Sequence, residues 1–382
     1  MVKIVCAPDS FKGSVTAAQA AAAMARGALE ALPEAEVLEL PFADGGEGTL
    51  DALLAVWGQE PRSAETVDAL RRPCTARYGL SPDGGTAVIE AAEANGLPQV
   101  SDQPLRPQTA DTYGVGLLAA RALEAGAREI LICIGGSATT DGGTGILTAL
   151  GVRLLDAEGE PVPPGGAGLS RVNRVDTSGL HPRARDVRWR IASDVENPLT
   201  GSEGAAAVFG PQKGADEQDV EALDAGLHHL AEVLSAGSGI GAEQLRSTPG
   251  YGAAGGIPAA LVSMFGAEVL PGSAMVAEAV GLEEALRGAD LVLTGEGRLD
   301  SQSLRGKVVD AVASRAPQGA VVVALAGAVQ LTPAECRGAG LAGAFSIAPG
   351  AAQLEDLQDR AAELLEQAAS HVVSLAQAAS RG

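Results

Sequence analysis

The chain has 382 residues, a length typical of two domains at roughly 150 residues each. Its formal net charge of −21 argues against nucleic acid and anionic membranes as partners, because like charges repel. The four cysteines are scattered and form no Cys-x-x-Cys pair, which argues against a disulfide framework and against a zinc site.

The chain begins on a strand pattern, without a leader-like apolar segment. Its longest apolar run, Gly319 to Val329, is far shorter than the ~20 residues that a membrane helix needs. We therefore expect a soluble, cytoplasmic protein with reduced thiols. Only four lysines occur, and three of them, Lys12, Lys213 and Lys307, adjoin a glycine. A compact ammonium group on a flexible loop suits phosphate oxygens.

The first sixty residues alternate between strand and helix patterns. Residues 2–6 and 36–40 read as strands, the capping box Thr16-x-x-Gln19 predicts a helix that begins at Thr16, and a second short helix ends at Trp57. This order indicates a parallel α/β sheet, in which functional groups gather at the carboxyl ends of the strands. Two polar turns follow these strands, Asp9-Ser10-Phe11-Lys12-Gly13 and Asp44-Gly45-Gly46-Glu47-Gly48.

The middle of the chain mixes several patterns. Strands at 74–80 and 86–91 flank Asp83-Gly84-Gly85, which is ordinary hairpin chemistry. A helix capped by Thr112 contains Gly114-x-Gly116-x-x-Ala119, but no strand precedes this dinucleotide-binding pattern, so we reject it. Further along we expect a surface excursion at 153–179, a strand at 187–192 and an amphipathic helix through 220–234.

Residues 128–150 are the most distinctive stretch. Ile130 to Ile134 reads as a buried strand, and a helix is expected from Gly145. The turn between them is rich in glycine and hydroxyl residues and contains one acid, Asp141. Such a turn favours an anion, whereas the acid would repel phosphate unless a cation lies between them. The stretch therefore predicts a site for metal-bound phosphate.

The last hundred residues return to alternating strands and helices. Strands are expected at 291–294, 320–325 and 342–347, followed by a long final helix. We predict a two-domain α/β fold: a Rossmann-like parallel-sheet domain built from both chain ends, residues 1–70 plus 275–382, and an inserted mixed α/β domain, residues 71–274.

Several turns share glycines, an acid and hydroxyl residues at the end of an apolar strand. No Walker A motif is present, because Gly306-Lys307 is followed by valine, and the four histidines form no Ser-His-Asp set. Carboxylates and lysines without histidine or thiolate suit Mg²⁺-assisted phosphoryl transfer. A nicotinamide dehydrogenase and a non-catalytic ligand-binding protein stay open as alternatives.

Six blocks stand out together, at residues 7–14, 43–49, 135–139, 194–199, 209–214 and 294–297. In this order they resemble the bacterial type 1 glycerate kinase family. The resemblance implies a two-domain α/β kinase that uses ATP and Mg²⁺ to phosphorylate D-glycerate to 2-phosphoglycerate, in a cleft between its domains. Thr140 stands where that family is expected to have asparagine, and Ser193 where cysteine or alanine is expected.

On these grounds each candidate residue is given a role. We expect Asp194 to be the base or substrate-orienting acid, and Lys12 and Lys213 to clamp the transferring phosphate and the substrate carboxylate. Asp44 and Asp141 are the candidate Mg²⁺ contacts, and Glu296 is a further one. The expected substrate- and phosphate-binding residues are Asp9, Ser10, Gly135, Gly136, Ser137, Thr139, Asn197 and Glu296. A kinase that gives 3-phosphoglycerate and a sugar-acid binding protein are the open alternatives.

Overall fold

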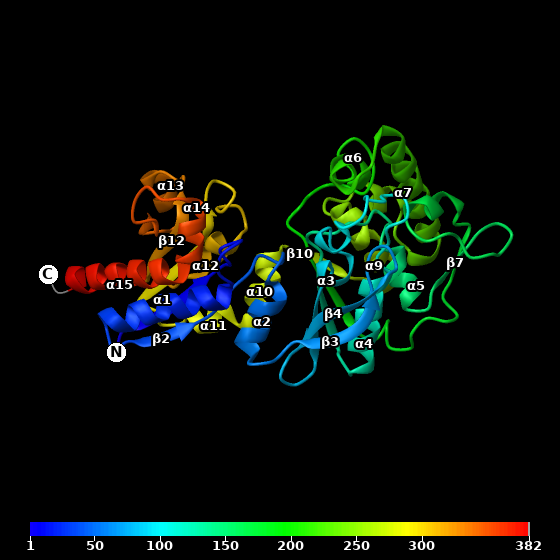
Figure 1. The fold of residues 1–382 in the computed structure, drawn as a ribbon. Coiled ribbons are helices and arrows are strands. Elements are labelled where there is room, and N and C mark those ends of the chain that lie inside the picture. The colour runs from blue at the N-terminus through cyan, green and yellow to red at the C-terminus, as the bar shows by residue number, and fades with distance from the viewer. Residues whose placement is uncertain (381–382) are drawn as a thin grey trace. The chain divides into compact units, whose positions relative to one another are not determined.

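The computed structural model describes residues 1–380, and the chain divides into two compact units. The first unit comprises Met1–Asp44, Asp51–Gly58 and Pro271–Gly382, and the second comprises Gly45–Leu50 and Gln59–Leu270. Both chain ends belong to the first unit, where Figure 1 draws them in blue and in orange to red.

The first unit is built on a five-stranded parallel sheet with the order β13-β12-β11-β1-β2. Its strands are β1 (Lys3–Pro8), β2 (Glu36–Glu39), β11 (Leu291–Leu299), β12 (Val321–Val329) and β13 (Gly343–Ser346). The apolar runs at the chain start and near its end are therefore neighbours, with Ile4 opposite Leu291 in the register. The predicted parallel sheet made from both chain ends is confirmed.

The helices of the first unit include a long pair that joins the chain ends. They are α1 (Ala17–Ala31), α2 (Thr49–Trp57), α10 (Gly272–Val280), α11 (Leu282–Leu286), α12 (Val308–Arg315), α13 (Pro333–Gly338), α14 (Leu354–Asp359) and α15 (Ala361–Ser380). The predicted capping box opens α1, since Gln19 N–H donates to Thr16 Oγ1 and Thr16 N–H donates to Gln19 Oε1. Helices α1 and α15 run side by side (Figure 1) and bury alanine, leucine and valine against β1, β11 and β12.

The second unit has a six-stranded sheet with the order β10-β9-β6-β5-β4-β3. Its strands are β3 (Arg62–Val67), β4 (Pro73–Leu80), β5 (Thr86–Glu90), β6 (Glu129–Cys133), β9 (Arg188–Ala192) and β10 (Glu268–Leu270). The pairs from β5 to β10 are parallel, and β3-β4-β5 is antiparallel. The predicted hairpin at Asp83 is confirmed, because its carboxylate accepts hydrogen bonds from Ser81 Oγ and Gly85 N–H.

The helices of the second unit range from single turns to the 22-residue α7, and α3 follows the carboxyl end of β5. They are α3 (Ala92–Asn95), α4 (Tyr113–Glu124), α5 (Thr144–Ala149), α6 (Ala205–Phe209), α7 (Glu217–Ser238), α8 (Ala242–Ser247) and α9 (Ile257–Phe265), with the 3₁₀ turns η1 (Pro98–Val100), η2 (Gly166–Arg171), η3 (Pro211–Lys213) and η4 (Ala253–Gly255). Strands β5, β6 and β9 contribute Ile89, Ile132 and Ile191 to a core packed against α4 and α9.

Three expectations about the elements need correction. Residues 153–179 are more than a surface excursion, because β7 (Arg153–Leu155) and β8 (Arg174–Asp176) form a small antiparallel sheet. Strand β11 continues past Thr294 to Leu299, paired with β12. Residues 59–70, expected in the first domain, lie in the second unit, where β3 pairs with β4.

Among the described residues, no helix combines the length and apolarity needed to span a membrane.

Candidate active site

The first unit gathers its candidate residues where its strand order reverses. From β1 the chain moves to β2 on one side and later to β11 on the other, so β1 and β11 flank a topological switch point. In doubly wound sheets, ligands bind outside the carboxyl ends of the strands at this point. Asp9 and Ser10 follow β1 directly, and Asp9 N–H donates to the Gly295 carbonyl of β11 at 2.8 Å.

Three carboxylates of the first unit interact at this switch point. Burial raises the pKa of Asp9 to about 7, the negative charges of Asp44 and Glu296 add to the rise, and Lys12 opposes it. Ser10 N–H donates to Asp9 Oδ1 at 2.6 Å, which also favours the ionised form. The predicted acids at 9, 44 and 296 and the predicted lysine at 12 are therefore electrostatic neighbours.

Glu296 differs from the sequence expectation in its placement. It lies inside β11, opposite Ala326 of β12, and not in a turn after the strand. Burial chiefly raises the pKa of its carboxyl group, while a hydrogen bond with Ser303 and the charge of Lys307 lower it. Its buried Oε1 atom has no hydrogen-bond partner among the described residues.

Oxygen donors of this kind fit Mg²⁺ by their chemistry. Mg²⁺ usually takes one or two carboxylates, with water and substrate phosphates completing the shell. The residues that the structure describes contain no group of three or more histidine, cysteine, aspartate or glutamate side chains able to hold a metal by themselves. The repulsion among Asp9, Asp44 and Glu296 is nevertheless the kind that a divalent cation relieves.

The second unit gathers its candidate residues along one edge of its sheet. Strands β5, β6 and β9 are parallel neighbours, with Glu90 opposite Cys133 and Cys133 opposite Ala192. Helix α3 follows the first of these strands, the glycine loop 135–143 follows the second, and Asp194 comes two residues after the third. Parallel pairing thus brings these three segments to the same edge.

Lys213 from η3 is buried against the glycine loop. Its side chain is 2% exposed, and Nζ donates to the Thr139 carbonyl at 2.6 Å and to Ser137 Oγ at 3.2 Å. Burial lowers the pKa of the amine to about 7, while the charge of Asp141 favours its protonated form. The structure therefore brings together three of the predicted residues, Lys213, Ser137 and Thr139.

Asp141 does not fit its predicted role as a Mg²⁺ contact. Its side chain is fully buried, and Oδ2 accepts hydrogen bonds from Thr112 N–H, Thr112 Oγ1 and Gly145 N–H at 2.8–2.9 Å. Its other oxygen, Oδ1, accepts one from Gly143 N–H at 3.0 Å. A carboxylate with four internal donors organises the loop, and we leave it out of the metal site. Thr112 accordingly makes no side-chain cap on α4.

The start of the glycine loop lies against the turn that follows Asp44. A Cβ built on Gly135 would lie 3.5 Å from Gly46 Cα, so the turn after Asp44 runs directly against the glycine loop inside the second unit. Gly136 has a φ of +71° and accepts a hydrogen bond from Leu97 N–H at 3.0 Å. Leu50 N–H, close after the same turn, donates to the buried carboxylate of Glu90 at 2.7 Å.

Asp194 and Asn197 occupy the loop that follows β9. Asp194 is exposed, whereas Asn197 is partly buried and donates from Nδ2 to the Glu203 carbonyl at 2.8 Å. The Asn197 carbonyl accepts from Gly252 N–H at 2.9 Å. Asn197 therefore shapes this loop, and Asp194 is the more exposed of the two.

Sequence reasoning missed Asn95 and Glu90, which both lie at the edge that carries the glycine loop. Asn95 is fully buried and donates from Nδ2 to Thr139 Oγ1 at 3.1 Å. The available signal was a polar residue just beyond an apolar strand, in Glu93-Ala94-Asn95-Gly96, but the sequence analysis gave this segment no role. In the first unit, Ser303 and Lys307 were likewise not placed beside Glu296.

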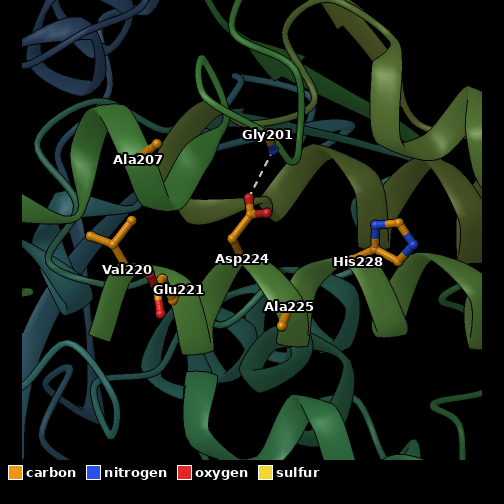
Figure 2. Close-up of a pocket in the computed structure, with 7 residues that line it drawn as sticks. All are labelled: Gly201, Ala207, Val220, Glu221, Asp224, Ala225 and His228. Carbon is orange, nitrogen blue, oxygen red and sulfur yellow. Dashed lines mark hydrogen bonds between the residues drawn. The ribbon is translucent and has the colours of Figure 1, made fainter. Parts of the chain in front are cut away.

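A hollow on the second unit lies apart from these groups. It has a volume of about 510 Å³ and is lined by Gly201, Ala207, Val220, Glu221, Asp224, Ala225 and His228. Figure 2 shows Asp224 turned toward Gly201, whose N–H donates to Asp224 Oδ1 at 2.8 Å. Acidic and small apolar side chains dominate this surface, which does not suit a phosphate-bearing ligand. The adjacent His228 and His229 have different partners, Glu232 and the Val172 carbonyl, because neighbouring residues on a helix point about 100° apart.

Comparison with known proteins identifies the family. The model of the glycerate kinase family matches residues 4–377. The chain belongs to the glycerate kinase family. It is 43% identical over 374 residues to "Glycerate kinase" of Bacillus subtilis (strain 168), which covers 98% of this chain and 97% of the relative.

Two further glycerate kinases support this assignment. The chain is 45% identical over 313 residues to "Glycerate 2-kinase" of Escherichia coli (strain K12), which covers 82% and 81% of the two chains. The crystal structure of a protein described as glycerate kinase 2 from Salmonella typhimurium LT2 matches with a TM-score of 0.91, at 41% identity and over 100% of both chains. The predicted fold and the predicted enzyme class, a kinase acting on an alcohol group, are confirmed.

Proposed function

We propose that this member of the glycerate kinase family transfers a phosphoryl group from ATP to the 2-hydroxyl of D-glycerate, giving 2-phosphoglycerate, and that it is of the bacterial type 1 branch. The observation that carries the proposal is the 45% identity to a relative named for 2-kinase activity. The lysine buried against a glycine loop and the carboxylates at a sheet switch point support the same chemistry, since phosphoryl transfer needs charge neutralisation and positioning.

The second unit supplies an anion-binding group in this proposal. Backbone at Gly135 and Gly136 approaches a ligand closely, Ser137 and Thr139 offer hydroxyl groups, and Lys213 adds a cation when protonated. Asp194 is the proposed base, because it is an exposed acid on the same edge and a carboxylate can accept the proton of the attacking hydroxyl. The proposed role of Asn197 is to shape the substrate-binding loop that follows β9.

The first unit supplies the proposed metal ligands and a second cation. Asp44 and Glu296 would hold Mg²⁺, with Asp9 beside them and Ser10 as a phosphate contact. When bound, Mg²⁺ supplies charge neutralisation at the phosphate oxygens. Lys12 is exposed in the turn after β1 and is the proposed second clamp. We assign no role in metal binding to Asp141.

Product analysis tests the proposed reaction. Purified protein with ATP, Mg²⁺ and D-glycerate should release ADP, and ³¹P NMR should identify 2-phosphoglycerate as the product. Formation of 3-phosphoglycerate would overturn the regiochemistry, and absence of ADP release would favour a sugar-acid binding protein. Omission of the metal should abolish turnover, and unchanged turnover with excess chelator would remove Mg²⁺ from the proposal.

Two variants test the assigned roles. Asp194→Asn should lower kcat at least 100-fold, within the range that a general base contributes. Glu196→Gln is a matched control, because Glu196 is also an exposed acid in the loop after β9. Lys12→Ala should lower kcat with little change in the unfolding midpoint, because Lys12 is exposed. Normal turnover of either test variant would remove that residue from the mechanism.

A further inference from the structure

Asn95 is tied to the glycine loop by its side chain and its backbone. It is the last residue of α3, just beyond β5, and its side chain is fully buried. Nδ2 donates to Thr139 Oγ1 at 3.1 Å, and the Asn95 carbonyl accepts from Ala138 N–H at 2.8 Å. Two residues on, Leu97 N–H donates to the Gly136 carbonyl at 3.0 Å. Residues 95–97 therefore hold the loop on both sides of Ser137.

Packing alone does not explain an asparagine at this position. Its buried Oδ1 atom has no hydrogen-bond partner among the described residues. Burying a polar atom without a partner is unfavourable, so an apolar side chain of similar size would fill the same space at a lower cost. The amide is thus better explained by its one side-chain hydrogen bond among the described residues, the bond to Thr139.

Thr139 connects this contact to the buried amine. Its carbonyl oxygen accepts from Lys213 Nζ at 2.6 Å, and the same nitrogen donates to Ser137 Oγ at 3.2 Å. A shift or rotation of Thr139 would therefore move the principal acceptor of Lys213. Asp141 restrains the later part of the loop, whereas the side chain of Asn95 anchors Thr139. Such side-chain anchors hold a site in its productive geometry.

We propose that Asn95 is a positioning residue for the phosphate-binding loop: it fixes Thr139, and through Thr139 it fixes Lys213 relative to Ser137. This inference rests on the proposed function for its consequence in catalysis, but the link from Asn95 to Lys213 stands on the contacts themselves.

The small number of lysines makes the link measurable without activity. Protein labelled with ¹³C at lysine Cε should give four resonances, one for each of Lys3, Lys12, Lys213 and Lys307. The Lys213→Met variant assigns the Lys213 signal by its loss. Asn95→Ala should move that signal and its titration midpoint while leaving the other three in place, and should lower kcat at least tenfold with a smaller change in KM.

Thr140→Val is the matched control. Thr140 is as fully buried as Thr139, but its Oγ1 atom has no hydrogen-bond partner among the described residues, so the isosteric change removes no contact. It should leave kcat and the Lys213 signal unchanged. Equal effects of Thr140→Val and Asn95→Ala would show that any change in this packing disturbs the loop and would overturn the proposal.

Two results separate this inference from the proposed function. A wild-type protein without kinase activity on D-glycerate would refute the proposed function, while the lysine signals would still test the role of Asn95. If Asn95→Ala does not fold, Asn95→Ser leaves a smaller cavity and still removes the reach to Thr139. A folded variant with an unmoved Lys213 signal and normal kcat would overturn the proposal.

Discussion

Lys213 Nζ lies 2.6 Å from the carbonyl oxygen of Thr139, in a site where its side chain is 2% exposed. Burial lowers the pKa of this amine from its ordinary 10.5 to about 7, against the opposing effect of Asp141. A nearby anion favours the charged form of a lysine. The amine is therefore placed to gain a proton when a phosphate-bearing ligand arrives.

This gain should appear as proton uptake on binding. At pH 8, Lys213 is mostly neutral in the free protein, so binding of ATP or 2-phosphoglycerate beside it should take up a fraction of one proton. Calorimetry in two buffers with different ionisation enthalpies measures this number. The uptake should disappear in Lys213→Met. Identical heats in both buffers for both ligands would show that neither one engages the amine.

The Asp141 carboxylate is predicted to matter for stability and not for metal binding. Asp141→Ala leaves the N–H groups of Thr112, Gly143 and Gly145 without their acceptor in a buried site, so it should lower the free energy of unfolding by about 3 kcal/mol or more. Urea denaturation measures the loss.

A milder substitution tests the metal at the same position. Asp141→Asn keeps the shape of the side chain and should be less destabilising than Asp141→Ala. The Mg²⁺ concentration that gives half-maximal activity should stay within about twofold of wild type, because a fully hydrogen-bonded carboxylate leaves no free oxygen for the ion. A large shift in that concentration, with normal stability, would restore the metal role.

Local patterns predicted much of the fold for physical reasons that act over short distances. The Thr16–Gln19 capping box and the Asp83 hairpin depend on neighbours a few residues away, and both occur as expected. Strand β11 was underestimated, because Gly295-Glu296-Gly297 has the composition of a turn. In the sheet these residues continue the pairing with β12, and a Cβ at Gly295 would meet the Leu325 carbonyl at 1.8 Å.

The candidate site was less predictable because its contacts are distant in sequence. The sequence placed Lys213 and Ser137 in one proposed site, but it could not show that they share a hydrogen bond across 76 positions. The sequence analysis assigned Asp141 to a metal site, whereas in the structure Thr112, 29 positions earlier, donates a hydrogen bond to that carboxylate. Composition cannot tell a carboxylate that faces a ligand from one that faces its own backbone, and only the fold supplies that distinction.

Asp9 should make the stability of the first unit depend on pH. Its pKa is raised from 3.8 to about 7, so the folded state binds more protons between these values, and this contribution to stability falls as pH rises from about 4 to 7. Asp44→Asn removes one of the charges that raise this pKa and should lower it. ¹³C NMR of the aspartate carboxyl groups measures the shift, and an unmoved Asp9 titration would contradict the coupling.

Arg71 pairs with a buried acid from a strained backbone position. Its φ is +62°, a conformation that favours glycine, in the turn between β3 and β4. Its Nε and Nη2 atoms donate to Asp111 Oδ2 at 2.7 and 2.6 Å, and its guanidinium lies 4.0 Å from the centre of the Tyr113 ring. Burial and the charge of Asp141 raise the pKa of Asp111. An arginine in a backbone conformation that favours glycine indicates that its side chain is needed there.

Arg71→Gly should therefore destabilise the protein even though it relieves strain. Glycine should recover about 1 kcal/mol of backbone strain, but the unpaired Asp111 should cost about 3 kcal/mol or more near neutral pH. In the variant, the folded pKa of Asp111 would rise further above its unfolded value. The loss in free energy of unfolding relative to wild type should therefore grow as pH increases from about 4 and should be smaller below that pH. Urea denaturation of wild type and variant at pH 4.5 and 7.5 measures it. The double variant Arg71→Gly/Asp111→Asn keeps the strain relief without the buried charge, and it should be more stable than Arg71→Gly at pH 7.5. If it is less stable, the unpaired charge of Asp111 is not the cause of the loss, and the ion pair does not explain the arginine at position 71.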